Sequence, residues 1–122
     1  MRILKNKLFH HWAKGLGLTD TALIKAVDEM NQGLYEANLG GNTYKKRVAI
    51  GNRGKRGGVR TIIAFKAHGK AIFIYGFTKN KRNNVTSKEE EALKALSKIY
   101  FSYNEHQIEK AIGAGEIIEV RK

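Results

Sequence analysis

The chain has 122 residues, of which 42% are apolar and 28% charged, and this composition excludes a disordered or fibrous protein. Its length is that of one domain, so we expect residues 1–122 to fold as a single unit. The absence of cysteine excludes disulfides and thiol chemistry and favours a reducing, cytoplasmic setting, and no segment is apolar enough for a signal sequence or a membrane span.

Helical periodicity comes first along the chain. Residues 7–15 indicate a short helix that packs Phe9 and Trp12 inward. Residues 19–32 indicate a second helix, because apolar residues recur there at helical spacing between a capping residue and a glycine. The segment 34–42 contains two adjacent glycines, and we interpret it as a connection.

Strand periodicity follows, and it predicts strands at about 44–50, 58–66 and 70–78. The remaining predicted elements are a capped helix within 85–103, a short helix within 104–115 and a final strand at 116–120. This order is typical of an α+β domain. We expect an antiparallel β-sheet meander with the N-terminal and C-terminal helices packed on one face, which leaves the other face available for binding.

The net charge of +12 is concentrated in the middle of the chain. Between Ala37 and Lys88 lie thirteen of the 23 lysine and arginine residues and none of the eleven acidic residues. Such a local excess predicts a surface directed at a polyanion, either a nucleic acid or an anionic membrane. A membrane is the weaker interpretation, because membrane-surface binding usually needs an amphipathic helix or a lipid anchor and this stretch is strand and loop.

Strand alternation predicts where these cations point. In the first strand Lys46 shares the apolar face with Val48, whereas Lys45 and Arg47 point to the opposite face. In the second strand Arg60 lies opposite the more apolar set of side chains. We therefore expect Lys45, Arg47 and Arg60 to converge on one face of the sheet.

Other residues give weaker signals. A single surface cation is usually only solvated, and Tyr75 and Phe77, which share one face of the third strand, are more often core residues than base-stacking residues. The glycine-rich loop at 51–58 lacks the spacing of a Walker or dinucleotide motif. None of the four histidines stands with Asp, Glu or Cys at ligand spacing, so we expect no metal site and no cofactor.

The segments “YKKRVA”, “GKRGGVRTIIAF” and “IFIYGFTKN”, followed by the capped helix, resemble the RelE family of bacterial toxins in the RelE/ParE superfamily of toxin-antitoxin modules. The resemblance extends from about Phe9 to Val120, and “GKRGGVR” before an apolar strand is its most specific part. It implies a small microbial ribonuclease-like fold and, for the RelE branch, an endoribonuclease that cuts mRNA in the ribosomal A site. It also implies a cognate antitoxin, which we expect to bind DNA and to be encoded next to the toxin.

The resemblance also implies site residues. The family's two basic residues on the first sheet strand fall on Lys45 and Arg47, and its arginine after the glycine-rich turn falls on Arg60. A later family arginine falls on Asn80, so the neighbouring Lys79 joins the catalytic candidates. The tyrosine that some members carry falls near Thr86. These two departures leave the general acid and base unassigned by the resemblance.

Metal-independent RNA cleavage requires that the 2′-hydroxyl lose a proton, that the phosphorane be stabilised and that the leaving oxygen gain a proton. We expect Arg47 and Arg60 to stabilise the phosphorane, and Lys45, crowded by other cations, to act as general base. Lys79, Lys81 or water is left as the proton donor. The residues expected to bind RNA are Arg53, Lys55, Arg56, Lys81 and Arg82.

Two other functions are compatible with the same residues. In a non-catalytic nucleic-acid-binding module, the cations would only neutralise phosphates, and no cleavage would occur. In a ParE-like toxin, the target would be DNA gyrase, and expression would trigger DNA-damage signalling while translation is initially intact.

Overall fold

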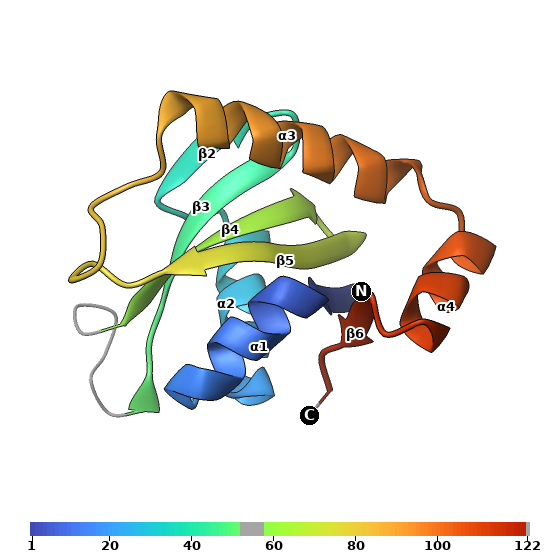
Figure 1. Ribbon diagram of the computed structural model, residues 1–122, viewed down its shortest axis with the longest axis horizontal. Coiled ribbons are helices and arrows are strands. Elements are labelled where there is room, and N and C mark those ends of the chain that lie inside the picture. The colour runs from blue at the N-terminus through green and yellow to red at the C-terminus, as the bar shows by residue number, and fades with distance from the viewer. Residues whose placement is uncertain (52–57, 122) are drawn as a thin grey trace.

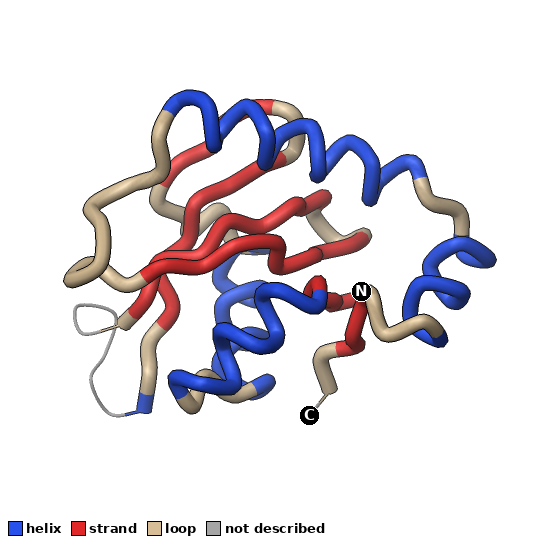
Figure 2. Tube along the Cα trace, viewed as in Figure 1, coloured by secondary structure: helices blue, strands red, loops and turns tan. Residues whose placement is uncertain are grey.

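The structure is a computed structural model that describes residues 1–51 and 58–121. Within these residues the elements are β1 (Arg2–Asn6), α1 (Lys7–Leu16), α2 (Asp20–Asn31), β2 (Ala37–Gly40), β3 (Thr43–Val48), β4 (Val59–Lys66), β5 (Lys70–Phe77), α3 (Ser87–Ser102), α4 (Glu105–Gly113) and β6 (Ile117–Glu119). The sheet runs through the centre of the molecule, with α3 on one side and α1 and α2 on the other (Figures 1 and 2). In the described part of the chain, no helix is long and apolar enough to cross a membrane.

The strands form one sheet in the order β2-β3-β4-β5-β1-β6. The predicted meander is β3-β4-β5, and all its pairings are antiparallel. β2 extends it at one edge, while β1 adds to β5 in parallel and to β6 in antiparallel orientation. The α+β class and the mostly antiparallel sheet are therefore confirmed, although β1 makes the sheet mixed.

Two strands were absent from the sequence prediction. β1 carries Lys5, which is buried and whose Nζ donates to Asp20 Oδ1 at 2.8 Å, so this cation does not keep the strand at the surface. β2 falls in the segment 34–42 that was interpreted as a connection. Both strands form through pairings with partners elsewhere in the chain, which local periodicity does not report.

Helices cover both faces of the sheet, so the prediction that they all pack on one face is wrong. One core lies under α1 and α2 and includes Phe9, Leu23, Val27, Ile63 and Phe73. The second lies under α3 and α4 and includes Leu4, Ile62, Ile72, Ile74 and Ile108. The physical reason is that β4 and β5 are apolar on both sides, the pattern of strands that are covered on both faces.

A bulge in β5 decides which way the end of this strand faces. Ile63 pairs with Phe73 but Ile62 pairs with Tyr75, so Ile74 is an extra residue in the ladder. The bulge places Tyr75 opposite Ile62, on the side of α3, whereas Gly76 meets the ring of Trp12 on the side of α1. The end of β5 therefore presents different residues from those that strict alternation from Phe73 would give.

One cation of the basic stretch is part of the interior. Lys46 lies on the α2 side of β3 and is only 3% exposed. Its Nζ forms an ion pair with Glu29 Oε1 of α2 at 2.8 Å. The alternation of β3 was thus predicted correctly, and the buried charge is compensated by a carboxylate from the helix that covers it.

Candidate functional site

Three cations on β3 and β4 occupy the same face of the sheet. Arg47 is the cross-strand partner of Arg60, and Lys45 is the partner of Ile62, which belongs to the core under α3 and α4. Cross-strand partners hold their Cβ atoms about 4.5–5.5 Å apart, so the two arginines are direct neighbours. We call Lys45, Arg47 and Arg60 the cation group.

The cation group is organised around a carboxylate that the sequence analysis missed, Glu36. Arg47 Nε donates to Glu36 Oε2 at 3.1 Å, Arg60 Nη2 lies 3.6 Å from the same oxygen, and Lys45 Nζ lies 4.0 Å from Glu36 Oε1. Glu36 lies one residue before the stretch without acids, and the pairing of β2 with β3 brings it to Lys45. Glu36 therefore offsets only one of the three positive charges of the cation group. The sequence signal for this contact is the pair Gly40 and Gly41, because a hairpin at these glycines brings Glu36 beside Lys45.

The segment between β5 and α3, residues 78–86, covers part of the cation group. Arg60 Nη1 donates to the carbonyl oxygen of Asn83 at 2.7 Å, and Lys45 Nζ donates to Asn84 Oδ1 at 3.3 Å. The side chains of Lys45 and Arg60 are only 14% and 15% exposed, whereas that of Arg47 is 42% exposed. A ligand from solvent therefore reaches Arg47 first. It reaches the other two fully only where it replaces contacts made by Glu36 and the β5–α3 segment.

Arg82, predicted to bind RNA, is engaged within the protein. Its Nη1 donates to Tyr75 Oη at 3.1 Å and to Glu89 Oε2 at 2.8 Å, and its Nη2 contacts Glu89 Oε1. The Arg82 guanidinium lowers the pKa of Glu89 to about 2, and the Glu89 carboxylate in turn raises the pKa of Arg82. Glu89 also completes the capping box with Thr86, so Arg82 links β5 to the start of α3.

The other predicted site residues are placed differently. Lys79 and Lys81 are exposed on the β5–α3 segment, and within the described residues no hydrogen bond or ion pair joins Lys79 to the cation group. Three predicted RNA-binding residues lie outside the described residues, namely Arg53, Lys55 and Arg56. The described part of the chain contains no cluster of three or more His, Asp or Glu residues placed to hold a metal ion.

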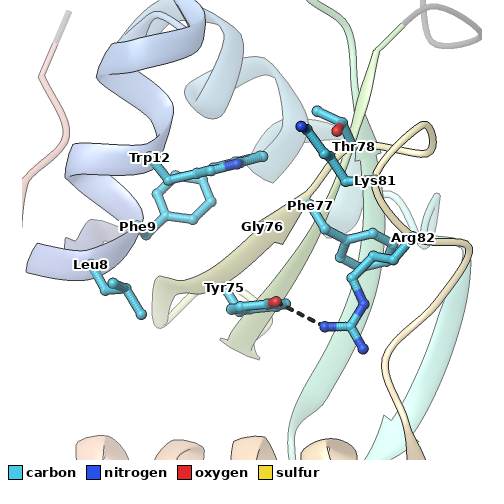
Figure 3. A pocket seen from close by; sticks show the side chains of 9 residues that line it. All are labelled: Leu8, Phe9, Trp12, Tyr75, Gly76, Phe77, Thr78, Lys81 and Arg82. Carbon is cyan, nitrogen blue, oxygen red and sulfur yellow. Dashed lines mark hydrogen bonds between the residues drawn. The ribbon is translucent and has the colours of Figure 1, made fainter.

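The β5–α3 segment contacts the cation group on one side, and on its other side it borders an aromatic pocket. It has a volume of about 280 Å³ and is bounded by α1, by the end of β5 and by Thr78, Lys81 and Arg82. Trp12 lies over Gly76 on one wall, and Tyr75, hydrogen-bonded to Arg82, lies across from it (Figure 3). We call the space between Trp12, Tyr75 and Phe77 the aromatic pocket.

The chemistry of the cation group suits a phosphate. Two guanidinium groups and an ammonium present donors to one place, and such groups bind phosphate oxygens through charge-assisted hydrogen bonds. The guanidinium groups of Arg47 and Arg60 both contact Glu36 Oε2, so one carboxylate oxygen holds them towards a common point. The arrangement is therefore a candidate anion site whose donors are held in place by the protein.

Comparison with protein families gives a match over nearly the whole chain. The model described as “RelE toxin of RelE / RelB toxin-antitoxin system” matches residues 1–120, which is nearly the whole chain. No individual curated protein matches the chain.

Proposed function

The chain belongs to the RelE family of toxins from toxin-antitoxin systems, and from this premise we propose that it is an endoribonuclease that cleaves mRNA on the ribosome and so inhibits translation. The observation that carries the proposal is the cation group. It gathers Lys45, Arg47 and Arg60 on one face of adjacent strands, with one carboxylate between them. A phosphodiester that becomes more negative during cleavage is the ligand that such a set of charges would stabilise most.

The proposed reaction is an attack by the RNA on its own phosphodiester, assisted by the cation group, a base and a proton donor. The 2′-hydroxyl oxygen attacks the adjacent phosphorus, the bond from phosphorus to the 5′-oxygen breaks, and a 2′,3′-cyclic phosphate and a free 5′-hydroxyl result. Arg47 and Arg60 bind the non-bridging oxygens, where charge grows in the transition state. Lys79, Lys81 or water supplies the proton to the leaving oxygen.

Two groups are candidates for taking the proton from the 2′-hydroxyl. Lys45 was the candidate from sequence, and it serves as a base only after losing its own proton. Glu36 is the candidate added by the structure, because its carboxylate accepts a proton directly and lies 3.1 Å from Arg47 Nε. A Glu36→Gln variant that still cleaves RNA would exclude Glu36 as the base and leave Lys45, since glutamine keeps a similar shape and lacks the carboxylate's basicity.

The ribosome fits this proposal as the element that orients the RNA. The side chains of Lys45 and Arg60 are largely covered in the free protein, so productive contact requires a substrate held in a defined position. Family membership implies a cognate antitoxin. We propose that this antitoxin is encoded beside the toxin and binds DNA as well as the toxin.

The test is to express the protein in bacteria and to map new 5′ ends in messenger RNA. We expect growth arrest with new ends inside translated regions only. Removing one charge-stabilising donor costs about 100- to 1,000-fold in rate, so Lys45→Ala, Arg47→Ala and Arg60→Ala are each expected to abolish detectable cleavage. Lys66→Ala is the matched control, because Lys66 is an exposed cation on the same strand and face as Arg60 and contacts the ring of Phe101.

Two outcomes contradict the proposal. A toxic, folded protein that produces no new 5′ ends is not an mRNA endonuclease, and DNA-damage signalling with intact translation would assign it to the gyrase-directed branch. Salt-dependent RNA binding that is lost in Arg60→Ala, without cleavage under any condition, would identify a binding module.

A further inference from the structure

The aromatic pocket forms where the pairing of β1 with β5 ends. β1 pairs with β5 only as far as Phe73, and the chain then turns into α1. Among the described strands, none pairs with the remaining edge of β5 from Tyr75 to Phe77, and this edge faces α1 and the β5–α3 segment (Figure 3). The pocket opens at this edge, and Leu8, 67% exposed, lies at its mouth.

The walls of the pocket are aromatic and held in place. A Cβ atom at Gly76 would lie 2.1 Å from Cζ3 of Trp12, so only glycine lets the indole lie directly against the strand. Phe9 supports the indole from below, with ring centroids 5.4 Å apart. On the other wall, the rings of Tyr75 and Phe77 are 6.2 Å apart and inclined by 35°. The Tyr75 hydroxyl is fixed by Arg82, and Arg82 is fixed by Glu89.

We propose that the aromatic pocket receives one unstacked base of the RNA strand whose phosphate lies at the cation group. This proposal rests on the proposed function and names a subsite for its substrate. A volume of about 280 Å³ is just below the roughly 300–1,000 Å³ of ordinary ligand pockets, which suits a single flat ring system. Proteins commonly bind single-stranded RNA through unstacked bases that stack on aromatic side chains of the protein.

The pocket and the cation group are connected through β4, β5 and the β5–α3 segment. Phe77 of the pocket is the cross-strand partner of Arg60, so their Cβ atoms are separated by about 4.5–5.5 Å. The same short segment, Arg82 to Asn84, bonds to Tyr75 on one side and to Arg60 and Lys45 on the other. Phosphate and base of neighbouring positions in one strand can therefore occupy the two sites together.

Charge at the rim favours a nucleic acid over a protein segment. Lys81 is exposed at the rim, and no acidic residue is among the described residues that line the pocket. Among the residues that the structure describes, Lys81 has no ion-pair partner. A nucleic acid that enters past Lys81 can place a phosphate against its ammonium group and stack a base on the aromatic walls of the pocket.

Trp12 provides a direct probe, because it is the only tryptophan of the chain. The ligand is a short single-stranded oligoribonucleotide with 2′-O-methyl groups throughout, which binds but cannot be cleaved by 2′-hydroxyl attack. The control ligand is the same oligonucleotide with abasic sites, which keeps the phosphates and lacks the bases. We expect the first to quench Trp12 fluorescence and to bind about 5- to 150-fold more tightly than the second, the effect of stacking one base.

Variants supply the second readout, measured as fluorescence anisotropy of labelled oligonucleotides. Trp12→Leu is expected to lose most of the preference for RNA with bases, while Trp12→Phe retains part of it. Phe101→Leu is the matched control, because Phe101 is a half-buried aromatic residue beside Lys66 but outside the pocket. Circular dichroism and thermal unfolding establish that each variant is folded.

The proposal is overturned if the intact and abasic oligonucleotides bind wild-type protein equally, if neither binds, or if binding leaves Trp12 fluorescence unchanged. Quenching by the antitoxin alone would assign the pocket to a protein partner and would also overturn it. None of these measurements requires cleavage. Failure of the ribonuclease assay with a positive result here would therefore refute the proposed reaction and leave the base pocket standing.

Discussion

The ion pair between Lys46 and Glu29 fixes α2 to the strand that carries the cation group, and the variant Glu29→Gln tests its contribution. The substitution removes the carboxylate and leaves the Lys46 ammonium in an environment where it is 3% exposed. Removing one partner of a buried pair costs about 3–5 kcal/mol. Glutamine still offers an oxygen to Lys46 Nζ, so we expect the lower end, a loss of about 3 kcal/mol in the free energy of unfolding.

Urea unfolding followed by circular dichroism measures this loss. For a protein of this size the slope is about 1–3 kcal/mol/M, so the midpoint should fall by about 1–3 M. Glu91→Gln is the control, because Glu91 lies 3.8 Å from Lys94 at the surface of α3 and is 76% exposed. Such a pair contributes about 0.5 kcal/mol or less, and the midpoint should barely change.

The reasoning is refuted if Glu29→Gln shifts the midpoint no more than Glu91→Gln does. It is also refuted if Glu29→Gln is destabilised but Lys46→Met combined with Glu29→Met is destabilised further, since replacing a buried pair by apolar residues is often neutral or stabilising. A positive result would show that the buried ion pair contributes to the stability of the fold that carries the cation group.

Three further predictions concern stability. The pKa of Glu89 is lowered from 4.5 to about 2 by Arg82, so its stabilising effect is present above pH 4.5 and lost as the pH falls towards 2; Glu89→Gln should show a smaller loss of midpoint between pH 5 and 2.5. Burial lowers the pKa of His10, so as the pH falls the unfolded chain is protonated at His10 at a higher pH than the folded protein. Wild type should therefore lose stability below about pH 6.5, and His10→Gln should lose less. Gly76→Ala should lower the free energy of unfolding by about 1–3 kcal/mol and change Trp12 fluorescence, because the methyl group collides with the indole; unchanged fluorescence would contradict the contact.

The meander and the cation group were predictable because both depend on alternation within single strands. Lys45, Arg47 and Arg60 are on one face and Lys46 on the other, as the period of two requires. Coverage of both faces was also predictable in principle from the apolar run at the start of β5. The expectation of one free face follows the general rule that helices gather on one face of an antiparallel sheet, and this local signal contradicts it.

What sequence reasoning missed depends on contacts between distant segments. β1 contains Lys5, and only the pairing with Asp20 of α2 explains how this cation is buried. Glu36 joins the cation group through the pairing of β2 with β3. A count of charges along the chain places Glu36 outside the basic stretch and so misses this contact. The aromatic pocket depends on the bulge at Ile74 and on α1 crossing the end of β5, and neither has a signature in a single strand.

The pairing of β1 with β6 has a consequence for the synthesis of the chain. Asn6 is opposite Ile117, so β1 emerges from the ribosome long before one of its two partners exists. At about 5–20 residues per second, the delay is roughly 5–20 s. β4 ends at Lys66, so only in the later part of this delay are both strands of the cation group, β3 and β4, complete, while the edge of the sheet at β1 still lacks β6 and is able to pair with another chain. A nascent toxin therefore passes through a period in which its charged face can form before its sheet is complete, and a partner that binds early would meet it in that state.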